Sequence, residues 1–222
     1  MSAILFDLYG TLIDIRTDET GLVFWKTFTK KMKKYKRYEP NELANLYSSE
    51  CKRLETEREE IDITFVFKNL FQVSEEISLK IAKIFRKSSI KYIRLYSGVK
   101  KLLNTLVKKG HHLYVLSNAQ SAFTLPELKK LKIDSYFNGI AISSEYGVKK
   151  PNQNFFLKAI ETFEIKEEEI IMIGNDFECD IQPAKELGFK TIFIESNLTP
   201  PNEVLDKIIG FNVNEILIRI MN

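Results

Sequence analysis

The stretch AILFDLYGTLID, residues 3–14, ends an apolar run on a carboxylate and follows it with a Gly-Thr pair. The apolar residues 4–6 are typical of a short buried strand. A charge placed directly after such a strand costs free energy unless water, a partner or a metal meets it. Asp7 therefore predicts a functional site at the end of the first strand, with Tyr9 two residues further on.

Length and composition limit the kind of protein. The chain has 222 residues, 44% of them hydrophobic, which is enough for one large domain or for a core with a smaller insertion. No stretch approaches the roughly 18 consecutive apolar residues that span a bilayer, and Asp7 interrupts the N-terminal apolar run too early for a signal peptide. Cys51 and Cys179 lack any paired or metal-ligand spacing. We expect a cytoplasmic protein with reduced thiols and no membrane association.

Four short apolar segments have the character of buried parallel strands. They are residues 3–6, 112–118, 169–176 and 190–196. Between the first two, the stretch 97–110 predicts a helix that takes Ser97 as its N-cap and stops at Gly110. The other helices expected after it are 151–163, 180–189 and 212–222. Strands that alternate with helices predict an α/β fold, a parallel sheet with helices on both faces.

The segment 15–95 differs from the rest of the chain. It contains no convincing strand, and its apolar residues recur at helical spacings, so we predict a small helical bundle that includes FVFKNLF, residues 65–71. The segment carries 18 Lys and Arg against 12 Asp and Glu, whereas the remainder has 15 against 18. Its most basic run is KKMKKYKR, residues 30–37. Met32 and Tyr35 continue an apolar stripe through that run, which favours a solvated helix face over a nucleic-acid interface.

Polar residues gather at the predicted strand ends, which is where ligands bind in an open parallel sheet. They are Asp7, Tyr9, Gly10, Thr11, Ser117, Asn118, Lys149, Lys150, Asn175, Asp176 and Asp180. Crowded carboxylates repel one another unless a cation lies between them, and Mg²⁺ prefers hard oxygen ligands. The set favours Asp7 as a nucleophile and Asp176 as a second carboxylate on a divalent metal. Lys150 and Ser117 would then neutralise an anionic group.

The order D-x-Y-G-T, S-N, K-P and G-N-D-x-x-x-D resembles the four motifs of the haloacid dehalogenase superfamily, and the likeness covers nearly the whole chain. The resemblance implies a Rossmann-like, doubly wound core made of residues 1–14 and 96–222. It also implies that residues 15–95 form an α-helical cap, which closes over the site and selects substrates. A basic cap would raise the local concentration of phosphorylated substrates.

The resemblance also assigns roles to single residues. Asp7 would form a covalent aspartyl intermediate, Ser117 would bind the transferred group and Lys150 would stabilise it. Thr11 and Asn118 complete the expected catalytic set. Mg²⁺ would be held by Asp7, the backbone carbonyl of Tyr9 and Asp176, with Asp180 either near the metal or capping the next helix. If the motif is shifted by one residue, Asn175 takes the first metal position and metal affinity falls.

Tyr9 departs from the pattern of most phosphatases in this superfamily, which carry a second Asp there as acid and base. An ordinary phenol titrates near pH 10, so Tyr9 is a poor substitute. The D-x-Y-G-T form resembles metal-independent 2-haloacid dehalogenases, which also use a cap arginine, for which Arg16 and Arg37 are candidates. Phosphonatases and transport ATPases of the superfamily, however, lack the second Asp and still use Mg²⁺.

Three functions follow from these observations. The first is a Mg²⁺-dependent phosphohydrolase that acts on a small, anionic, phosphorylated metabolite through an aspartyl-phosphate intermediate. The second is a 2-haloacid dehalogenase that works through an aspartyl ester. The third is a catalytically weak relative that binds a ligand without turning it over. Asp176 and Asp180 favour the first, because dehalogenases replace the metal-binding acid by a small polar residue.

Overall fold

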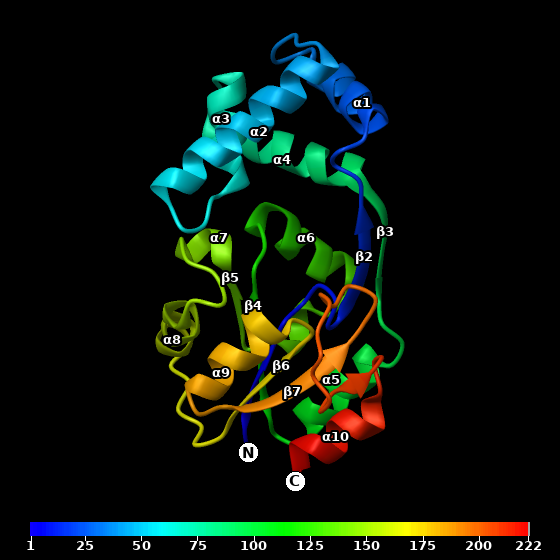
Figure 1. The fold of residues 1–222 in the computed structure, drawn as a ribbon, viewed down its shortest axis with the longest axis vertical. Coiled ribbons are helices and arrows are strands. Elements are labelled where there is room, and N and C mark those ends of the chain that lie inside the picture. The colour runs from blue at the N-terminus through cyan, green and yellow to red at the C-terminus, as the bar shows by residue number, and fades with distance from the viewer. Residues whose placement is uncertain (222) are drawn as a thin grey trace.

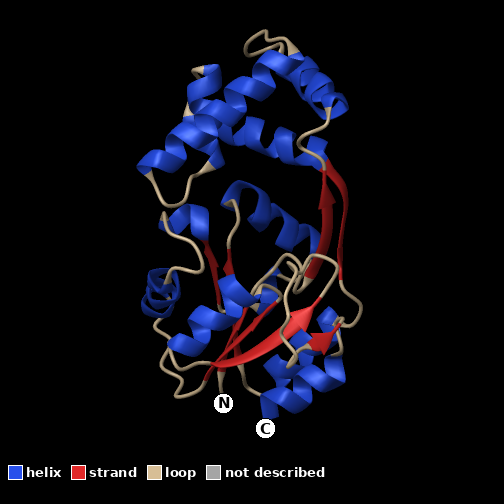
Figure 2. Cartoon of the chain, in the orientation of Figure 1, coloured by secondary structure: helices blue, strands red, loops and turns tan. Residues whose placement is uncertain are grey.

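The computed structural model describes residues 1–221, and a six-stranded sheet forms its centre (Figure 1, Figure 2). The spatial order is β5-β4-β1-β6-β7-β8, and all neighbouring strands are parallel. The strands are β1 (Ala3–Phe6), β4 (His112–Ser117), β5 (Gly139–Ile142), β6 (Ile170–Gly174), β7 (Lys190–Glu195) and β8 (Ile208–Ile209). Since β1 lies between β4 and β6, the direction of winding reverses beside it. Ligands bind at such a point, beyond the carboxyl ends of the strands.

Successive residues of each strand face opposite sides of the sheet, and both sides are covered by helices. On one side, Ile4 and Phe6 belong to a buried cluster with α5 (Val99–Lys108) and α10 (Val213–Met221). On the other side, Ala3 and Leu5 belong to a cluster with α8 (Gln153–Thr162) and α9 (Gln182–Glu186). The prediction of an α/β, Rossmann-like doubly wound sheet is therefore confirmed.

The predicted strands and helices agree closely with the structure, but the helices Ser121–Leu131 and Ser143–Tyr146 and two strands of the sheet were not predicted. The predicted first strand matches β1, and the other three predicted strands match β4, β6 and β7 within two residues. Strands β5 and β8 were not predicted, because β5 begins with a glycine, a residue depleted in strands, and β8 is only two residues long. Ser97 is not the N-cap of α5: that position is occupied by Gly98, whose φ of 90° lies in the left-handed region.

Four helices form a separate group, here called the helical layer, above α6 (Ser121–Leu131) and α7 (Ser143–Tyr146) in Figure 1. They are α1 (Leu22–Met32), α2 (Pro40–Glu57), α3 (Ile63–Phe71) and α4 (Glu75–Ser89). The predicted helix at residues 65–71 lies within α3. The buried Phe85 contacts the rings of Phe28 and Tyr47, with centroids 5.2 and 5.1 Å away, and stacks at 6.5 Å on Phe123 of α6. Aromatic packing thus joins the helical layer to the rest of the protein.

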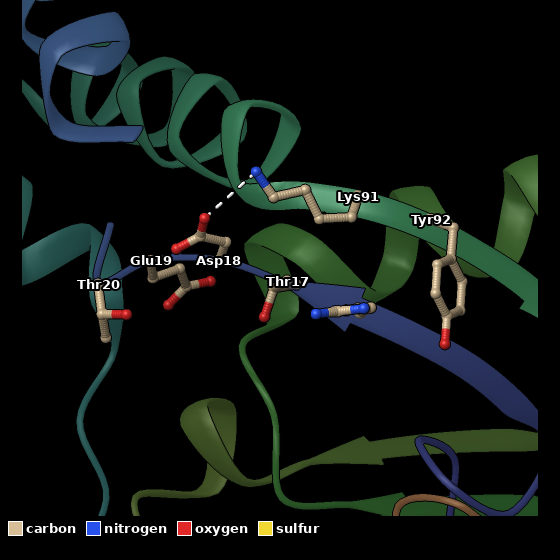
Figure 3. Close-up of a pocket in the computed structure, with 7 residues that line it drawn as sticks. Thr17, Asp18, Glu19, Thr20, Lys91 and Tyr92 are labelled. Carbon is tan, nitrogen blue, oxygen red and sulfur yellow. Dashed lines mark ion pairs between the residues drawn. The ribbon is translucent and has the colours of Figure 1, made fainter. Parts of the chain in front are cut away.

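A two-stranded antiparallel ribbon connects the helical layer to the sheet region (Figure 2). It pairs β2 (Ile13–Thr17) with β3 (Ile90–Leu95), so the expectation of no strand in residues 15–95 is wrong at both ends of that segment. The two strands are distant in sequence and half exposed, so neither has the continuous apolar character of a buried strand. Beside the ribbon lies a cavity of about 600 Å³, where Lys91 pairs with Asp18 at 3.2 Å (Figure 3).

The basic run at residues 30–37 lies where α1 ends. Met32 is fully buried and Tyr35 packs against the same cluster, as the apolar stripe predicts, but α1 stops at Met32 rather than continuing through the run. Cys51 and Cys179 are free thiols. Within residues 1–221, no helix combines the length and the apolar character needed to cross a membrane.

Candidate active site

A small cavity of about 180 Å³, here called the Asp7 pocket, lies at the carboxyl ends of β1, β4 and β6. The residues that line it come from five separate parts of the chain. They are Asp7, Tyr9, Ser117, Asn118, Lys150, Asn175, Asp176, Cys179, Asp180, Leu198 and Pro200. The fold thus brings together residues that are up to 193 positions apart in the sequence, from Asp7 to Pro200. Of the residues with predicted catalytic or metal-binding roles, Thr11 does not line this pocket but bonds to Asp7 directly, and the others that line it are Asp7, Tyr9, Ser117, Asn118, Lys150, Asp176 and Asp180.

Lys150 is the central cation of the pocket and is only 2% exposed. Its ammonium donates to Asp7 Oδ1 at 2.9 Å, to Asp180 Oδ1 at 2.6 Å and to the carbonyl oxygen of Leu116 at 2.8 Å. All three donors of the ammonium are therefore used. Burial alone would lower the pKa of Lys150, but the carboxylates of Asp180 and Asp7 outweigh burial and hold that pKa above its ordinary value.

Asn118 fixes the loop that carries Lys150. Its side-chain amide donates to the backbone carbonyl of Lys150 at 2.8 Å and accepts from the backbone N–H of Lys150 at the same distance. This reciprocal pair places the lysine at the end of β4. Ser117, the last residue of β4, is 1% exposed and lines the pocket beside Asp7. A hydroxyl at this position can donate to an anion bound next to Asp7.

The carboxylate of Asp180 accepts hydrogen bonds from Lys150 and from the backbone. One carboxylate oxygen pairs with Lys150, and the other accepts from the backbone N–H groups of Asn175 at 3.1 Å and Asp176 at 3.0 Å. A Cβ on Gly174 would lie 2.3 Å from this carboxylate, so glycine is required for the approach. Burial raises the pKa of Asp180, and the ammonium of Lys150 opposes that rise. Asp180 thus positions Lys150. The helix-capping role, which was the alternative expected for Asp180, is taken by Asp176.

Thr11 and Asn175 hold the second oxygen of Asp7. The hydroxyl of Thr11 donates to Asp7 Oδ2 at 2.9 Å. The hydrogen-bond network assigns the amide nitrogen of Asn175 to a position 3.1 Å from Asp7 Oδ2, Thr11 Oγ1 and the carbonyl oxygen of Tyr9. Gly10, with a φ of 91°, makes room for this side chain, because a Cβ there would lie 2.3 to 2.8 Å from the amide atoms.

Asp176 lies next to Asn175 but points its carboxylate differently. Its Oδ1 accepts from the backbone N–H of Cys179 at 2.9 Å and caps the helical turn Phe177–Ile181. Asn175, rather than Asp176, therefore reaches the oxygen atoms of Asp7 and Tyr9. Among residues 1–221, no three His, Cys, Asp and Glu side chains are grouped in a way that could hold a metal ion.

The corner formed by Asp7, Tyr9 and Asn175 has oxygen donors of the kind that Mg²⁺ prefers. With nitrogen at the inner end of its amide, Asn175 donates to both neighbours. With oxygen there, the amide oxygen lies 3.1 Å from both Asp7 Oδ2 and the Tyr9 carbonyl oxygen, and only a cation between them removes the repulsion. The donor set fits Mg²⁺ with a single carboxylate and two carbonyl oxygens, one carboxylate fewer than the resemblance implies.

The hydroxyl of Tyr9 is engaged away from Asp7. It donates to Glu127 Oε2 of α6 at 2.6 Å and lies 3.1 Å from Thr124 Oγ1. Burial and the negative charge of Glu127 raise the pKa of Tyr9, so the phenol keeps its proton. Glu127 also accepts from Arg86 of α4 at 2.7 Å, which joins the helical layer to α6.

Sequence reasoning missed several residues of this region. Glu127, Thr124 and Arg86 surround Tyr9, and the only signal for them was a glutamate within the apolar helix FTLPELKKL. Leu198, Pro200 and Cys179 line the Asp7 pocket. Burial raises the pKa of the Cys179 thiol to about 12, so this thiol stays protonated and unreactive at neutral pH. Neither Arg16 nor Arg37 is among the described residues that line the Asp7 pocket, and Arg16 lines the cavity beside the ribbon instead.

Comparison with known families agrees with this arrangement. The family model described as "Haloacid dehalogenase-like hydrolase" matches residues 4–194, which include every motif discussed above. The chain belongs to the haloacid dehalogenase-like hydrolase family. The resemblance noted in the sequence is therefore confirmed, and the protein is a member of a hydrolase family.

Curated relatives with sequence similarity to the chain have phosphatase names. The glyceraldehyde 3-phosphate phosphatase of Pyrococcus furiosus is 32% identical over 50% of this chain and 46% of its own length. The chain therefore spans about half the length of that relative. The phosphoglycolate phosphatase of Aquifex aeolicus is 29% identical over 86% of this chain and 83% of its own length.

Solved structures share the fold at low sequence identity. A 2-haloacid dehalogenase from Pseudomonas syringae pv. tomato superimposes with a TM-score of 0.69 at 16% identity, covering 100% of this chain and 98% of that chain. A HAD phosphatase from Thermococcus onnurineus has a TM-score of 0.65 at 21% identity, covering 100% of this chain and 98% of that chain. These likenesses support the fold across both the sheet region and the helical layer.

The buried ion pairs of Lys150 predict a large effect of Lys150→Met on stability. The substitution leaves Asp7 and Asp180 without a counter-charge, and removing one partner of a buried pair costs about 3–5 kcal/mol. Urea unfolding followed by the fluorescence of Trp25, the single tryptophan, measures the change. Lys149→Met, at the neighbouring half-exposed lysine, is the matched control and is expected to change stability by less than about 1 kcal/mol. Equal losses for the two variants would contradict the assignment.

Proposed function

We propose that the protein is a Mg²⁺-dependent phosphohydrolase that acts on a small phosphorylated metabolite through an aspartyl-phosphate on Asp7. The observation that supports it best is the buried contact of the Asp7 carboxylate with Lys150 and Thr11, in a pocket where Ser117 can meet an anion. A carboxylate held between a cation and a hydroxyl donor is oriented to attack an electrophile at one fixed place.

The chemistry proceeds in two displacements at phosphorus. A carboxylate oxygen of Asp7 bonds to the phosphorus atom while the bond to the leaving oxygen breaks, and that oxygen takes a proton from water. A second water molecule then attacks the phosphorus and gives a proton to the hydroxide left by the first water, the bond to Asp7 breaks, and inorganic phosphate leaves with Asp7 restored. Lys150 and Ser117 stabilise the charge that develops on the phosphoryl oxygens.

Asp7, the carbonyl of Tyr9 and the side-chain oxygen of Asn175 would hold Mg²⁺. When bound, the ion supplies Lewis-acid charge that offsets the repulsion between Asp7 and an incoming phosphate. The charge of the pocket supports this assignment, because three carboxylates line it with a single ammonium, that of Lys150, among the described residues. Asp176 and Asp180 contribute to this negative charge, while their hydrogen bonds tie them to Cys179 and Lys150.

Residues 15–95 would serve as the cap of this site, and residues 1–14 and 96–222 as its core. The position of the helical layer over α6 and α7 supports that division, although β2 crosses the first proposed boundary, while β3 ends at the second (Figure 1). Tyr9 would anchor Glu127 rather than take the place of the missing acid and base. A small phosphorylated metabolite would be the substrate, because a pocket of about 180 Å³ accepts a phosphoryl group and little more.

One observation favours a 2-haloacid dehalogenase as the second candidate. Asn175, a small polar residue, lies next to Asp7 where a metal-binding acid was expected. Tyr9 also resembles the tyrosine in the corresponding motif of the dehalogenases. The expected cap arginines do not support it, since neither Arg16 nor Arg37 is among the described residues that line the Asp7 pocket, and Arg86 is already paired with Glu127. A catalytically weak protein is the third candidate, and it predicts no turnover in either assay.

Asp7→Asn is expected to abolish phosphate release, because an amide oxygen cannot displace the leaving group. Phosphate is measured with p-nitrophenyl phosphate and a panel of phosphorylated metabolites, with Mg²⁺ and after chelation by EDTA. The wild-type protein should lose activity in EDTA and regain it when Mg²⁺ is returned. Halide release from 2-chloropropionate without metal would favour the dehalogenase, and phosphate release that persists in EDTA would contradict the metal assignment.

Asn175→Asp is expected to strengthen Mg²⁺ binding by roughly tenfold, because it places a second carboxylate beside Asp7. Without metal the same variant should unfold at a lower temperature than the wild-type protein, since the two carboxylates repel each other. Calorimetric titration and thermal unfolding with and without Mg²⁺ measure both effects.

Asp176→Asn is the matched control for this substitution. It should change stability by less than about 1 kcal/mol, because asparagine caps a helix about as well as aspartate, and it should leave Mg²⁺ affinity nearly unchanged. If Asp176→Asn instead abolishes Mg²⁺ binding while Asn175→Asp has no effect, Asp176 is the metal ligand.

Tyr9→Phe is expected to keep kcat within about tenfold of the wild-type value, whereas loss of a general acid lowers kcat by about 10²–10⁴-fold. Its stability should fall by about 1–3 kcal/mol, because the hydrogen bond to the charged Glu127 is lost. Tyr92→Phe removes a similar bond to Asp14 in the exposed ribbon and serves as the control. A loss of kcat beyond about 10²-fold with unchanged folding would show that Tyr9 takes part in the chemistry.

A further inference from the structure

A second cavity of about 480 Å³ lies between the helical layer and the sheet region, next to the Asp7 pocket. The two cavities share Tyr9 and Asn118, so they adjoin at the site of the proposed reaction. We call it the upper cavity. Residues of α2, α4 and α6 contribute to its walls, which places it beneath the helical layer of Figure 1. A substrate whose phosphoryl group lies at Asp7 would extend its leaving group into this space.

Among the described residues, Arg86 is the cation that lines the upper cavity, and its charge is already neutralised. Its guanidinium donates to both carboxylate oxygens of Glu127, at 2.7 and 3.4 Å, and lies 3.7 Å from Glu19. The Arg86 and Glu127 side chains are 15% and 7% exposed, so water does not loosen the pair. A carboxylate on a substrate would have to displace Glu127, which Tyr9 also holds. The upper cavity therefore has no free cation to offer an anionic leaving group.

Negative charge dominates the remaining walls. Glu19, Glu55 and Glu60 line the cavity, and the side chain of Glu60 is only 10% exposed. The nearest cation to Glu60 is Lys149, whose ammonium lies 3.9 Å away on a half-exposed side chain. Burial raises the pKa of Glu60, and a cation in the cavity would favour its charged form.

The charged groups around the upper cavity carry a net negative charge. They are four glutamates, the three of the lining and Glu127, against two cations, Arg86 and Lys149, which leaves a net charge of −2. Tyr47 and Phe123 complete the walls, and their rings already stack on Phe85, with Arg86 over Phe123. The excess of carboxylates forms a surface that favours an ammonium group and repels a carboxylate.

We infer that the upper cavity selects phosphate monoesters whose leaving group carries an amino group, and that it rejects those whose leaving group carries a carboxylate. This inference rests on the proposed function for the position of the phosphoryl group. It sets the chain apart from a phosphoglycolate phosphatase, whose named substrate bears a carboxylate, and it disfavours 2-haloacids for the same reason.

A series of two-carbon esters tests the inference at nearly constant size. 2-Aminoethyl phosphate, 2-hydroxyethyl phosphate and phosphoglycolate differ in carrying an ammonium, a hydroxyl and a carboxylate. We expect kcat/KM of the wild-type protein with Mg²⁺ to fall in that order, by at least about tenfold from the first to the last. Calorimetric titration of the Asp7→Asn variant with the same three esters should give the same order of affinity. Hydrolysis or binding of phosphoglycolate that equals or exceeds that of the amino ester overturns the inference.

Charge-neutralising variants locate the selectivity in the upper cavity. Glu60→Gln should reduce the preference for the amino ester over phosphoglycolate by roughly threefold or more, and Glu55→Gln makes the same test at an exposed position that folding tolerates. Glu76→Gln, on the exposed face of α4, is the control and should leave the ratio unchanged. An unchanged ratio in both Glu60→Gln and Glu55→Gln overturns the inference.

The two proposals fail in different ways. If the wild-type protein releases no phosphate from any ester, including p-nitrophenyl phosphate, the proposed function fails. The order of affinities in the Asp7→Asn variant then still decides whether the cavity prefers an ammonium. If phosphate is released fastest from phosphoglycolate, the proposed function stands and the selectivity is wrong.

Discussion

The buried ammonium of Lys150, held between Asp7 and Asp180, is the constraint on which the site depends. A charge of this kind is stable in the interior only when every donor is satisfied, so the ends of three strands must meet at one point. β1 supplies Asp7, β4 supplies the Leu116 carbonyl, and the turn after β6 supplies Asp180. Glycine at 174 follows from the same requirement, because the Asp180 carboxylate occupies the space of its missing Cβ.

The parts of the fold that follow from local pattern could be predicted from the sequence. Buried strands such as β1 and β6 are continuous apolar runs, and their ends are marked by polar residues, so both their positions and the location of the site were clear. The ribbon of β2 and β3 could not be predicted in this way. Its two strands are separated in the sequence by all four helices of the helical layer, and they are exposed on one side. Pairing of that kind depends on contacts between distant segments, which periodicity does not encode.

The identity of the residue next to Asp7 could not be decided from sequence either. Asn175 and Asp176 are adjacent polar residues after β6, and a shift of one position exchanges their roles. The backbone decides between them: the chain turns directly into the helical segment Phe177–Ile181, whose unsatisfied N–H groups take the Asp176 carboxylate as their cap. Asn175 is left facing Asp7, and a motif that appears to carry two acidic residues presents an amide there.

Tyr9 connects the chemistry of the Asp7 pocket to the selectivity of the upper cavity. Its hydroxyl donates a hydrogen bond to Glu127, and Glu127 also accepts from Arg86. A tyrosine at residue 9 therefore helps to keep Arg86, the arginine among the described residues that lines the upper cavity, paired with Glu127. A shorter carboxylate at residue 9 would repel Glu127 instead of binding it, and would weaken the hold on Arg86. The same residue that removes the usual acid and base therefore also leaves the upper cavity acidic. Leaving groups that carry positive charge are the ones that this acidic cavity suits.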